Sequence, residues 1–408
     1  MIKRKIYLIG IGMGDNGTIT GCAKKHIKES FALAGAERML EPFRGEAENT
    51  GKKIMVSYIP SDIGNFFREN LGENQCGAVL LSGDVGFSSG AKGLLQELVD
   101  FDVELVPGIS SVVYFCSRLG LSWEQMCIAS AHGKNINLIQ RIQRHKYCFF
   151  LMNGGKSLKQ LCEKLEYYHM ENVTMYVGER LSYPDERIIK GCVQEIKQME
   201  FGSLLVLVVL NEKAADWTTV SLPDSEFIRS KVPMTKQEIR AVSIGKLRIT
   251  HDAVVYDVGA GTGSVSVEMA LCSPDIVVYA IEKNPDALSL LEQNRQKFAA
   301  DNMVIIPGTA PENMVDLPAP THVFIGGSSG NMRSILRCVF EKNPECRVVV
   351  NIIALNSMAE IMQILEDNGD LEYDIVQLQS SYSKKAGSYQ LMMANNPVYV
   401  ISLWKSKK

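Results

Sequence analysis

One short segment limits the folds open to this chain more than any other. The apolar run AVVYDV, residues 253–258, leads into the loop Asp257-Val-Gly259-Ala-Gly261-Thr-Gly263, and an apolar helical pattern begins at Ser264. Glycine allows the backbone to turn sharply and to approach a ligand that a Cβ atom would exclude. A strand, a glycine loop and a helix in direct succession therefore predict an α/β fold with a ligand at the end of a strand.

The spacing of this loop favours S-adenosylmethionine over a dinucleotide. A dinucleotide site prefers G-x-G-x-x-G, whereas here the third glycine comes one residue early, at Gly263. Glu282 ends the next apolar run, VVYAIE, and a carboxylate there can accept hydrogen bonds from both ribose hydroxyls. The acidic flanks, Asp257 and Glu282, repel phosphate and attract a sulfonium and an ammonium group. The alternative is that the glycines only form a tight turn, which Asp257 caps.

Length and composition narrow the class of protein. A chain of 408 residues predicts two domains of about 200 residues each. The formal net charge of −3 argues against a nucleic acid as partner, because a phosphate backbone calls for a basic face. The ten cysteines include no C-x-x-C pair, so we expect no metal site and a cytoplasmic protein with reduced thiols. The longest strongly apolar run, Leu204–Leu210, has the length of a strand, so we expect no membrane span.

Short apolar runs alternate with amphipathic stretches, which predicts α/β domains with mainly parallel sheets. The polar segment Trp217–Pro233 interrupts this alternation and has no sustained period. We therefore expect a first domain at residues 1–212, a linker at 213–228 and a second domain at 229–408. The expected strands are Lys5–Ile11, Ala78–Ser82, Val103–Val106, Tyr147–Met152, Val173–Val177 and Leu204–Leu210 in the first half, and Ala253–Val258, Val277–Ile281, Met303–Pro307, His322–Ile325, Arg347–Ile352, Tyr373–Leu378 and Pro397–Trp404 in the second.

A second set of glycine turns lies in the first half. The loop Gly10-Ile-Gly12-Met-Gly14 follows the first apolar run, and similar turns occur at residues 82–87 (SGDVGF), 106–111 (VPGISS) and 178–186 (GERLSYPDE). Each turn comes where an expected strand ends, which is the usual place for a ligand crevice in an α/β sheet. One such turn alone indicates only a change of chain direction, whereas the four together predict a binding site.

These motifs resemble two families of S-adenosylmethionine-dependent methyltransferases. In the first half, AGAERML, LLSGDVGFSSGAKGLL, VELVPGISSVVYFCSRLGLSW, SAHGK and GERLSYPDERI resemble the tetrapyrrole methylases, a fold of two α/β lobes, and their branch that methylates carbon 5 of a corrin precursor. In the second half, PDSEFIRSKVPMTKQEIRAVSIGKLRI, DVGAGTGSVSVEMA, PGTAPENM, VFIGGSSGNM and NPVYVI resemble the class I (Rossmann-like) enzymes that methylate carbon 15 and decarboxylate the ring C acetate. The order is that of the fused precorrin C5,15-methyltransferase (decarboxylating) family of cobalamin biosynthesis.

The resemblance implies one S-adenosylmethionine site in each half. Carried over position by position, the cofactor contacts fall on Gly12, Gly83, Asp84, Val85, Ser110, Ser111, Met152 and Leu181 in the first half, and on Thr235, Gly259, Ala260, Gly261, Thr262, Gly263, Glu282 and Ala310 in the second. Three positions depart from the family pattern. Met13 and Val85 stand where relatives often have proline, which would fix φ. Thr309 replaces an acid, which puts a carboxylate contact to the adenine amine in doubt.

The implied chemistry needs little from the side chains. Methyl transfer from a sulfonium is a displacement that requires close positioning and the exclusion of water. A reduced tetrapyrrole offers an electron-rich carbon and can act as the electron sink for decarboxylation, so we assign no Ser, Cys or His as nucleophile and leave the catalytic residues unknown. His132 is the most conspicuous polar candidate in the first half, and a turn histidine bonded to the backbone is the plainer interpretation.

A corrin precursor carries several carboxylates, which calls for a cationic site. Residues 229–248 contain six Lys and Arg against one acid. Lys236 and Arg240 are four residues apart and share one helix face, so we expect Lys236, Arg240 and Lys246 to bind substrate; a solvated helix face is the alternative. Lys384 and Lys385, expected in a loop, are weaker candidates.

Two other functions stay open, an RNA or protein methyltransferase and a non-catalytic S-adenosylmethionine-binding protein. The near-neutral charge and the tetrapyrrole methylase half argue against the first, and the sequence lacks its Asn-Pro-Pro-Tyr or Pro-Cys motif. The expected partners are a small-molecule corrin precursor and further copies of the chain in a homo-oligomer. The sequence leaves open whether the substrate carries cobalt.

Overall fold

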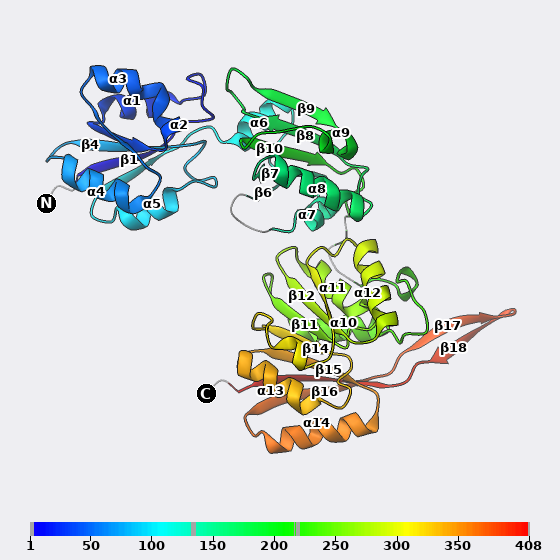
Figure 1. The fold of residues 1–408 in the computed structure, drawn as a ribbon. Helices are drawn as coiled ribbons and strands as arrows, with labels where there is room; N and C mark the ends of the chain where they lie inside the picture. Colours follow the sequence, from blue (N-terminus) through cyan, green and yellow to red (C-terminus); the bar gives the residue numbers. More distant parts are fainter. Residues whose placement is uncertain (1–3, 132–135, 216, 218–220, 407–408) are drawn as a thin grey trace. The chain divides into compact units, whose positions relative to one another are not determined.

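The computed structural model describes residues 4–131, 136–215, 217 and 221–406, so His132 lies outside the described residues. The chain is a mixed α/β protein with several sheets, as predicted (Figure 1). It divides into two compact units. Unit 1 comprises residues 1–134, 146–162 and 172–212, and unit 2 comprises residues 135–145, 163–171 and 213–408. Within the described ranges, no helix is both long and apolar enough to cross a lipid bilayer.

The first sheet of unit 1 is parallel throughout and is buried on both faces. Along its strand β1 (Lys5–Gly10), Ile6 and Leu8 pack into one hydrophobic cluster, and Tyr7 and Ile9 pack into another. The alternation follows from the two-residue period of a strand, and burial on both faces explains the continuous apolar run. The strand order is β3 (Lys53–Val56), β2 (Ala32–Gly35), β4 (Cys76–Leu81), β1 and β5 (Asp102–Val106). The accompanying helices are α1 (Gly21–Glu29), α2 (Glu37–Leu40), α3 (Arg44–Asn49), α4 (Pro60–Asn70) and α5 (Ala91–Glu97).

The second sheet of unit 1 is mostly antiparallel, which corrects the prediction of mainly parallel sheets. Its central strand β10 (Leu205–Leu210) runs antiparallel to both neighbours. All of its residues except the last are buried, and a strand buried on both faces reads as a continuous apolar run in either direction. The strand order is β6 (Cys127–Ser130), β7 (Tyr147–Met152), β10, β8 (Thr174–Glu179) and β9 (Arg187–Gly191). Unit 1 also contains α6 (Ser111–Leu119), α9 (Val193–Lys197) and the first part of α8 (Gly155–Tyr167), whereas α7 (Leu138–Arg144) belongs to unit 2.

Unit 2 has a seven-stranded sheet between two layers of helices (Figure 1). One hydrophobic cluster joins one face of the sheet to α10 (Gln237–Leu247), α11 (Ser264–Cys272) and α12 (Pro285–Lys297), and a second cluster joins the other face to α13 (Met332–Lys342) and α14 (Leu355–Asp367). The last strand lies antiparallel between two others, while the rest of the central sheet is parallel. The strand order is β13 (Met303–Pro307), β12 (Val277–Glu282), β11 (Val254–Val258), β14 (His322–Ile325), β15 (Arg347–Ile352), β19 (Val398–Lys405) and β16 (Leu371–Leu378).

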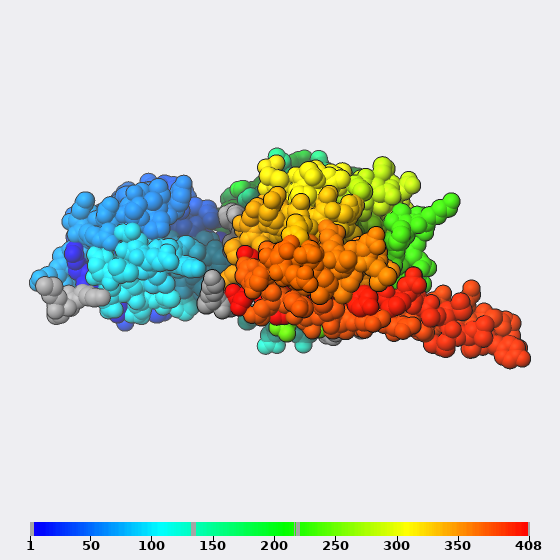
Figure 2. Space-filling model, turned by 90° about the horizontal axis from the view of Figure 1, so that it is seen from below, coloured from blue at the N-terminus to red at the C-terminus, as the bar shows by residue number. Residues whose placement is uncertain are grey.

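A β-hairpin projects from unit 2 between the last two strands of the sheet (Figures 1 and 2). Every residue of β17 (Ser381–Ala386) and β18 (Tyr389–Ala394) is exposed. Lys384 and Lys385 lie in β17, so the prediction that they lie in a loop is wrong. Strand β17 reads SYSKKA and has no apolar run by which a strand could be recognised, which is why its lysines were expected in a loop.

Three described residues of the expected linker pack on unit 2. Phe227 is 4% exposed within the hydrophobic cluster of α10 to α12, and Trp217 and Leu222 pack against the same cluster. A short 3₁₀ helix covers Asp224–Glu226. These residues therefore pack on the second domain. Because they are separated by polar residues, the sequence of the segment shows neither a helical nor a strand period.

Candidate active site

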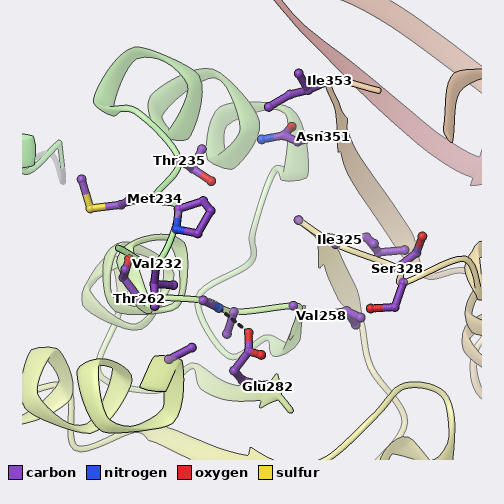
Figure 3. Close-up of a pocket in the computed structure, with 18 of the residues that line it drawn as sticks. Val232, Met234, Thr235, Val258, Thr262, Glu282, Ile325, Ser328, Asn351 and Ile353 are labelled. Carbon is purple, nitrogen blue, oxygen red and sulfur yellow. Dashed lines mark hydrogen bonds between the residues drawn. The ribbon is translucent and has the colours of Figure 1, made fainter. Parts of the chain in front are cut away.

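Unit 2 contains a cavity of about 1000 Å³ at the carboxyl ends of its parallel strands (Figure 3). Ligands of open α/β sheets bind at this edge, and the volume lies at the upper end of the usual range for ligand sites, about 300–1000 Å³. The walls come mainly from residues 232–236, 258–262, 281–284, 308–310, 325–329 and 351–354. Eight residues that the sequence predicts as contacts line the cavity, namely Thr235, Lys236, Gly259, Ala260, Gly261, Thr262, Glu282 and Ala310.

The glycine loop forms part of the cavity wall, and a Cβ atom on Gly259 would lie only 2.7 Å from the carbonyl oxygen of Gly327. Gly261 has a φ of +56°, in the left-handed region that favours glycine, and a Cβ atom on it would lie 3.4 Å from the carbonyl oxygen of Pro233. Gly263, also predicted as a contact, does not line the cavity. A Cβ atom on Gly263 would lie 2.3 Å from Cδ1 of Leu291 on α12, so this glycine permits close helix packing.

Glu282 is fixed by backbone amides at the end of β12. The N–H of Gly261 donates to its Oε2 at 2.8 Å, and the N–H groups of Lys283 and Asn284 both donate to its Oε1 at 2.8 Å. A carboxylate has about four acceptor positions, so these three bonds leave one position for a ligand hydroxyl. The bond to Gly261 also ties the acid directly to the glycine loop (Figure 3).

Asp257 does not line the cavity and has a different environment. Its side chain is 1% exposed, the hydroxyl of Ser266 donates to its Oδ2, and its Oδ1 has no hydrogen-bond partner within the described residues. Burial raises the pKa of Asp257 to about 7, and the nearby charge of Glu282 adds to this increase. Asp257 therefore stands behind the glycine loop as a buried carboxyl group that holds its proton near neutral pH.

Thr309 and Ala310 form the wall beyond β13. The hydroxyl of Thr309 donates to Oε2 of Glu312 at 2.9 Å, and its amide donates to Oδ1 of Asn313 at 3.0 Å. Backbone hydrogen bonding and the Thr309 hydroxyl hold the pKa of Glu312 below its ordinary value. A charged carboxylate thus remains next to this wall although position 309 itself is not acidic.

The predicted basic site does not form as a unit. Lys236 lines the cavity, but Arg240 has no exposed surface and is paired with Glu268 and Asp224. Lys246 is not in the cavity wall; its ammonium group pairs with Asp374 instead. Lys236 and Arg240 do lie on the same side of the chain, but both pair with Asp224. The Nζ of Lys236 is 3.6 Å from one carboxylate oxygen of Asp224, and the Nη1 of Arg240 is 2.7 Å from the other. A guanidinium group engaged in this way is not free to meet a substrate carboxylate.

Several polar residues of the cavity wall were not predicted from the sequence. Ser328 and Asn331 follow β14, Asn351 lies near the end of β15, and Asn395 and Asn396 follow the hairpin. The rule that located the glycine loop, polar or small residues at the carboxyl end of a strand, points to the first three positions as well. The pair after the hairpin carries no such signal, because β18 was not expected as a strand.

Three glycine turns meet in unit 1. Ideal Cβ atoms on Gly10 and Gly108 would lie 2.6 and 2.2 Å from the carbonyl oxygen of Gly83, and Gly12 forms a β-bridge with Gly83. The carboxylate of Asp84 holds the turns together, since it accepts from the N–H of Gly86 at 2.8 Å and from the N–H of Gly108 at 3.0 Å. The structure therefore brings three of the four turns to one edge of the first sheet and gives Asp84 a bracing position among them.

The other predicted contacts of unit 1 lie around these turns. Ser110 caps α6, and the Cα atom of Ser110 would lie 3.8 Å from a Cβ atom on Gly83. Leu181 belongs to a hydrophobic cluster of the second sheet, against which Met13 from the first glycine loop packs. The remaining predicted contacts are Val85, which packs against a cluster of the first sheet, and Ser111 and Met152, which are buried.

Comparisons with known proteins separate the two halves in the same order. Residues 226–405 match the family described as precorrin methyltransferase domain, and residues 5–197 match the tetrapyrrole (corrin/porphyrin) methylases. A probable cobalt-precorrin-6B C(15)-methyltransferase (decarboxylating) of Pyrobaculum calidifontis is 37% identical over 191 residues, which cover 46% of this chain and 97% of that protein. The chain belongs to the precorrin methyltransferase family. The resemblance read from the motifs is thereby confirmed, and the protein is a methyltransferase.

Other relatives match a similar share of the chain. The cobalt-precorrin-6B C(15)-methyltransferase (decarboxylating) of Salmonella typhimurium is 39% identical over 188 residues, which cover 46% of this chain and 97% of that protein. The crystal structure of precorrin-6y C5,15-methyltransferase from Geobacter metallireducens is 37% identical, covers 46% of this chain and 97% of the solved chain, and gives a TM-score of 0.44. The curated relatives are thus about half as long as this methyltransferase.

Proposed function

We propose that this chain is a bifunctional S-adenosylmethionine-dependent C-methyltransferase that methylates carbons 5 and 15 of a precorrin or cobalt-precorrin and decarboxylates its ring C acetate in cobalamin biosynthesis. The observation that carries the proposal is the cavity where the glycine loop and Glu282 meet at the strand ends of unit 2. The names of the relatives support the C(15) methylation and the decarboxylation. The tetrapyrrole methylase match of residues 5–197 supports a second methylation, at carbon 5.

Unit 2 fits a class I (Rossmann-like) methyltransferase fold. From β11 the chain moves outward to β12 and β13 and then returns to the other side of β11 with β14 and β15. A reversal of this kind leaves a crevice beside the central strand, which is the favoured ligand position of open α/β sheets. The glycine loop follows β11 and Glu282 ends β12, so both lie at this crevice.

The residues of the cavity fit S-adenosylmethionine, which supplies the methyl group as an electrophile. The backbone at Gly261 comes close to the ligand space because it carries no Cβ atom, and the remaining acceptor position of Glu282 suits a ribose hydroxyl. Thr235 and Ala310 contribute the facing walls. We assign the binding of this cofactor to Thr235, residues 259–262, Glu282 and Ala310, with Gly263 as a packing glycine.

For these reactions, the residues of the cavity have to orient the two reactants and exclude water. The attacking group is an electron-rich carbon of the tetrapyrrole, so the enzyme holds it against the methyl group and supplies no nucleophile of its own. In the decarboxylation, carbon dioxide leaves the acetate, the macrocycle takes up the electron pair, and a proton replaces the lost group. Lys236 is the predicted cation that lines the cavity, and we assign it to a substrate carboxylate.

For unit 1 we propose the second cofactor site, at the three glycine turns around Gly83. Its predicted contacts are Gly12, Gly83, Asp84, Val85, Ser110, Ser111, Met152 and Leu181. We further propose a cytoplasmic homo-oligomer without nucleic acid partners, with a first domain at residues 1–212 and a second domain after the segment 213–228. Expression of residues 1–212 and 213–408 as separate proteins tests the boundary, because each should remain soluble and bind S-adenosylhomocysteine.

Titration calorimetry with S-adenosylhomocysteine tests the cofactor proposal, with two sites per chain as the expected result. Turnover is tested with metal-free and cobalt-loaded precorrin, with product mass as the readout. We expect a gain of two methyl groups and the loss of one carbon dioxide. Methylation of RNA or protein instead would favour the alternative methyltransferase class, and binding without any turnover would favour a non-catalytic protein.

A further inference from the structure

Arg240 on α10 occupies an unusual position for a charged residue, since its side chain has no exposed surface. Its Nε donates to Oε1 of Glu268 at 2.9 Å, and its Nη1 donates to Oδ1 of Asp224 at 2.7 Å. The guanidinium group also donates to two backbone carbonyl oxygens, those of Thr235 and Leu222, each at 2.5 Å. The planar fork of arginine suits such a set of partners, which the single ammonium group of lysine cannot reproduce.

The partners of Arg240 come from two places that border the cavity. Leu222, Asp224 and Thr235 belong to the segment before α10, whose residues 232–236 form one cavity wall. Glu268 belongs to α11, the helix that begins directly after the glycine loop. Glu268 also accepts the N–H of Leu222 at 3.0 Å, so segment and helix are joined twice. Arg240 thus links the wall to the element that carries the glycine loop.

The wall and the loop lie next to each other at the cavity, which both line. The carbonyl oxygen of Pro233 lies 3.4 Å from the place of a Cβ atom on Gly261. A small displacement of the segment therefore changes the space above the loop. Thr235 connects Arg240 directly to the cavity, because its carbonyl oxygen accepts a hydrogen bond from Arg240 and the residue itself lines the cavity.

We propose that Arg240 is a positioning residue that fixes the wall of residues 232–236 against the glycine loop and thereby sets the affinity for S-adenosylmethionine. It touches neither cofactor nor substrate. The inference rests on the proposed function for the identity of the ligand, but the ordering of the wall is independent of it. Without the guanidinium group, the carbonyl oxygens of Leu222 and Thr235 lose their hydrogen-bond donor. The wall of residues 232–236 then moves and the cofactor site widens.

The main variant is Arg240→Lys, which keeps the charge and loses the fork. Because an unpaired Glu268 is strongly destabilising in the interior, a second variant, Arg240→Met with Glu268→Gln, removes both charges together and keeps an acceptor for Leu222. Arg347→Lys is the matched control. Arg240 lies over the ring of Phe227, with 4.8 Å between its Cζ and the ring centroid. Arg347 lies over the ring of Trp404 at the same distance and donates to the carbonyl oxygen of Lys246 at 2.6 Å. Arg347 does not line the cavity.

Hydrogen exchange of the ligand-free full-length chain gives the first readout, and calorimetry and kinetics with S-adenosylmethionine give the second. In Arg240→Lys and in the double variant, the peptide covering residues 229–240 should exchange faster. The dissociation constant for S-adenosylhomocysteine and the KM for the cofactor should rise about tenfold or more, a loss of about 1.4 kcal/mol, with kcat within about twofold. Arg347→Lys should lower only the thermal midpoint.

Two results overturn the proposal. Unchanged exchange at residues 229–240 in both variants shows that Arg240 does not order the wall. Faster exchange with unchanged cofactor affinity and KM shows that Arg240 serves stability alone. If the parent protein binds no S-adenosylhomocysteine at the second-half site, as judged by an unaltered titration in Gly261→Val, the proposed function fails, while the exchange measurement still decides whether Arg240 orders the segment.

Discussion

The glycine loop of residues 257–263 and the basic segment of residues 229–248 both predict a binding surface, and the structure treats them differently. The loop lines the cavity through Gly259 and Gly261. In the basic segment, Lys236 lines the cavity, whereas Arg240 is buried and Lys246 pairs with Asp374. Most of the loop therefore lines the cavity, as predicted from backbone geometry, whereas only one of the three residues predicted from side-chain charge does.

The difference has a physical cause. A positive φ at Gly261 is a requirement of one position, so the sequence records it locally as glycine. The place of a cation depends on where its counter-ions lie, and Glu268 and Asp374 are 28 and 128 residues away from their partners. A run of cations therefore predicts ion pairs as readily as it predicts a ligand, and only the tertiary structure distinguishes them.

The largest effect is expected for Gly261→Val. The left-handed backbone costs a β-branched residue about 1–3 kcal/mol, and the new side chain meets the wall at Pro233 and fills the space over the loop. We expect affinity at the second-half site to fall roughly 100-fold or more, so that calorimetry finds one equivalent of S-adenosylhomocysteine instead of two. Gly245→Ala on α10, where a Cβ atom has nothing within 4 Å, is the control. Two equivalents in Gly261→Val would refute the assignment of the loop.

Arg240→Ala should lower stability strongly, in addition to the loss of cofactor affinity expected for the Arg240 variants. It leaves the buried carboxylate of Glu268 without its counter-ion, and breaking a buried pair typically costs about 3–5 kcal/mol. Burial already raises the pKa of Glu268, an effect that Arg240 opposes, so the pKa should rise further in the variant. Denaturant unfolding of the full chain gives the measurement. A normal unfolding free energy together with weaker precorrin binding would restore the basic-site interpretation.

The pH dependence of stability tests whether Asp257 is a buried acid with a raised pKa. Because the folded-state pKa of Asp257 is about 7 against an ordinary 3.8, the folded protein binds this proton more tightly than the unfolded chain does. This contribution to stability is complete below about pH 4, is lost as the pH rises to about 7, and amounts to about 4 kcal/mol at most. Asp257→Asn should therefore become more stable relative to the parent as the pH rises from about 4 to about 7, and the difference should stay constant above that. A parallel pH profile in both proteins would contradict the buried acid; the exposed Asp252→Asn is the control.

The strands show how far the sequence alone reaches. The bounds of β7, β13, β14 and β15 agree with the expected ones, because each strand is a compact apolar run between polar residues. The strands β2, β3, β6 and β9 were not expected, since they are only four or five residues long and β3 and β9 are partly exposed edge strands. For such strands the pairing partner, and not the local pattern, determines the structure.

The site shows the same limit. Residues that act through the backbone or at a strand end, such as Gly261 and Glu282, line the cavity as expected. Asn395 and Asn396 reach the cavity only because the hairpin returns the chain to the sheet beside β15, a long-range arrangement without a local signal. Asp84 lies among the predicted turns, but its hydrogen bonds to Gly86 and Gly108 give it a bracing position that only the folded chain defines.

The smallest effects should distinguish Lys236 from Lys246 on the same segment. Lys236 lines the cavity, so its loss removes a charge-assisted hydrogen bond to a substrate carboxylate, about 1.5–3 kcal/mol. At about 1.4 kcal/mol per tenfold, Lys236→Ala should raise the KM for precorrin roughly 10- to 100-fold at the carbon 15 step. Lys246→Ala breaks a part-exposed pair with Asp374, so unfolding free energy should fall by about 0–1 kcal/mol and KM should not change. Product mass after limited turnover then separates the halves, because Lys236→Ala should accumulate a singly methylated product that retains its acetate. Equal KM values for the two variants would mean that Lys236 does not meet a substrate carboxylate, and that other groups of the cavity wall bind the carboxylates instead.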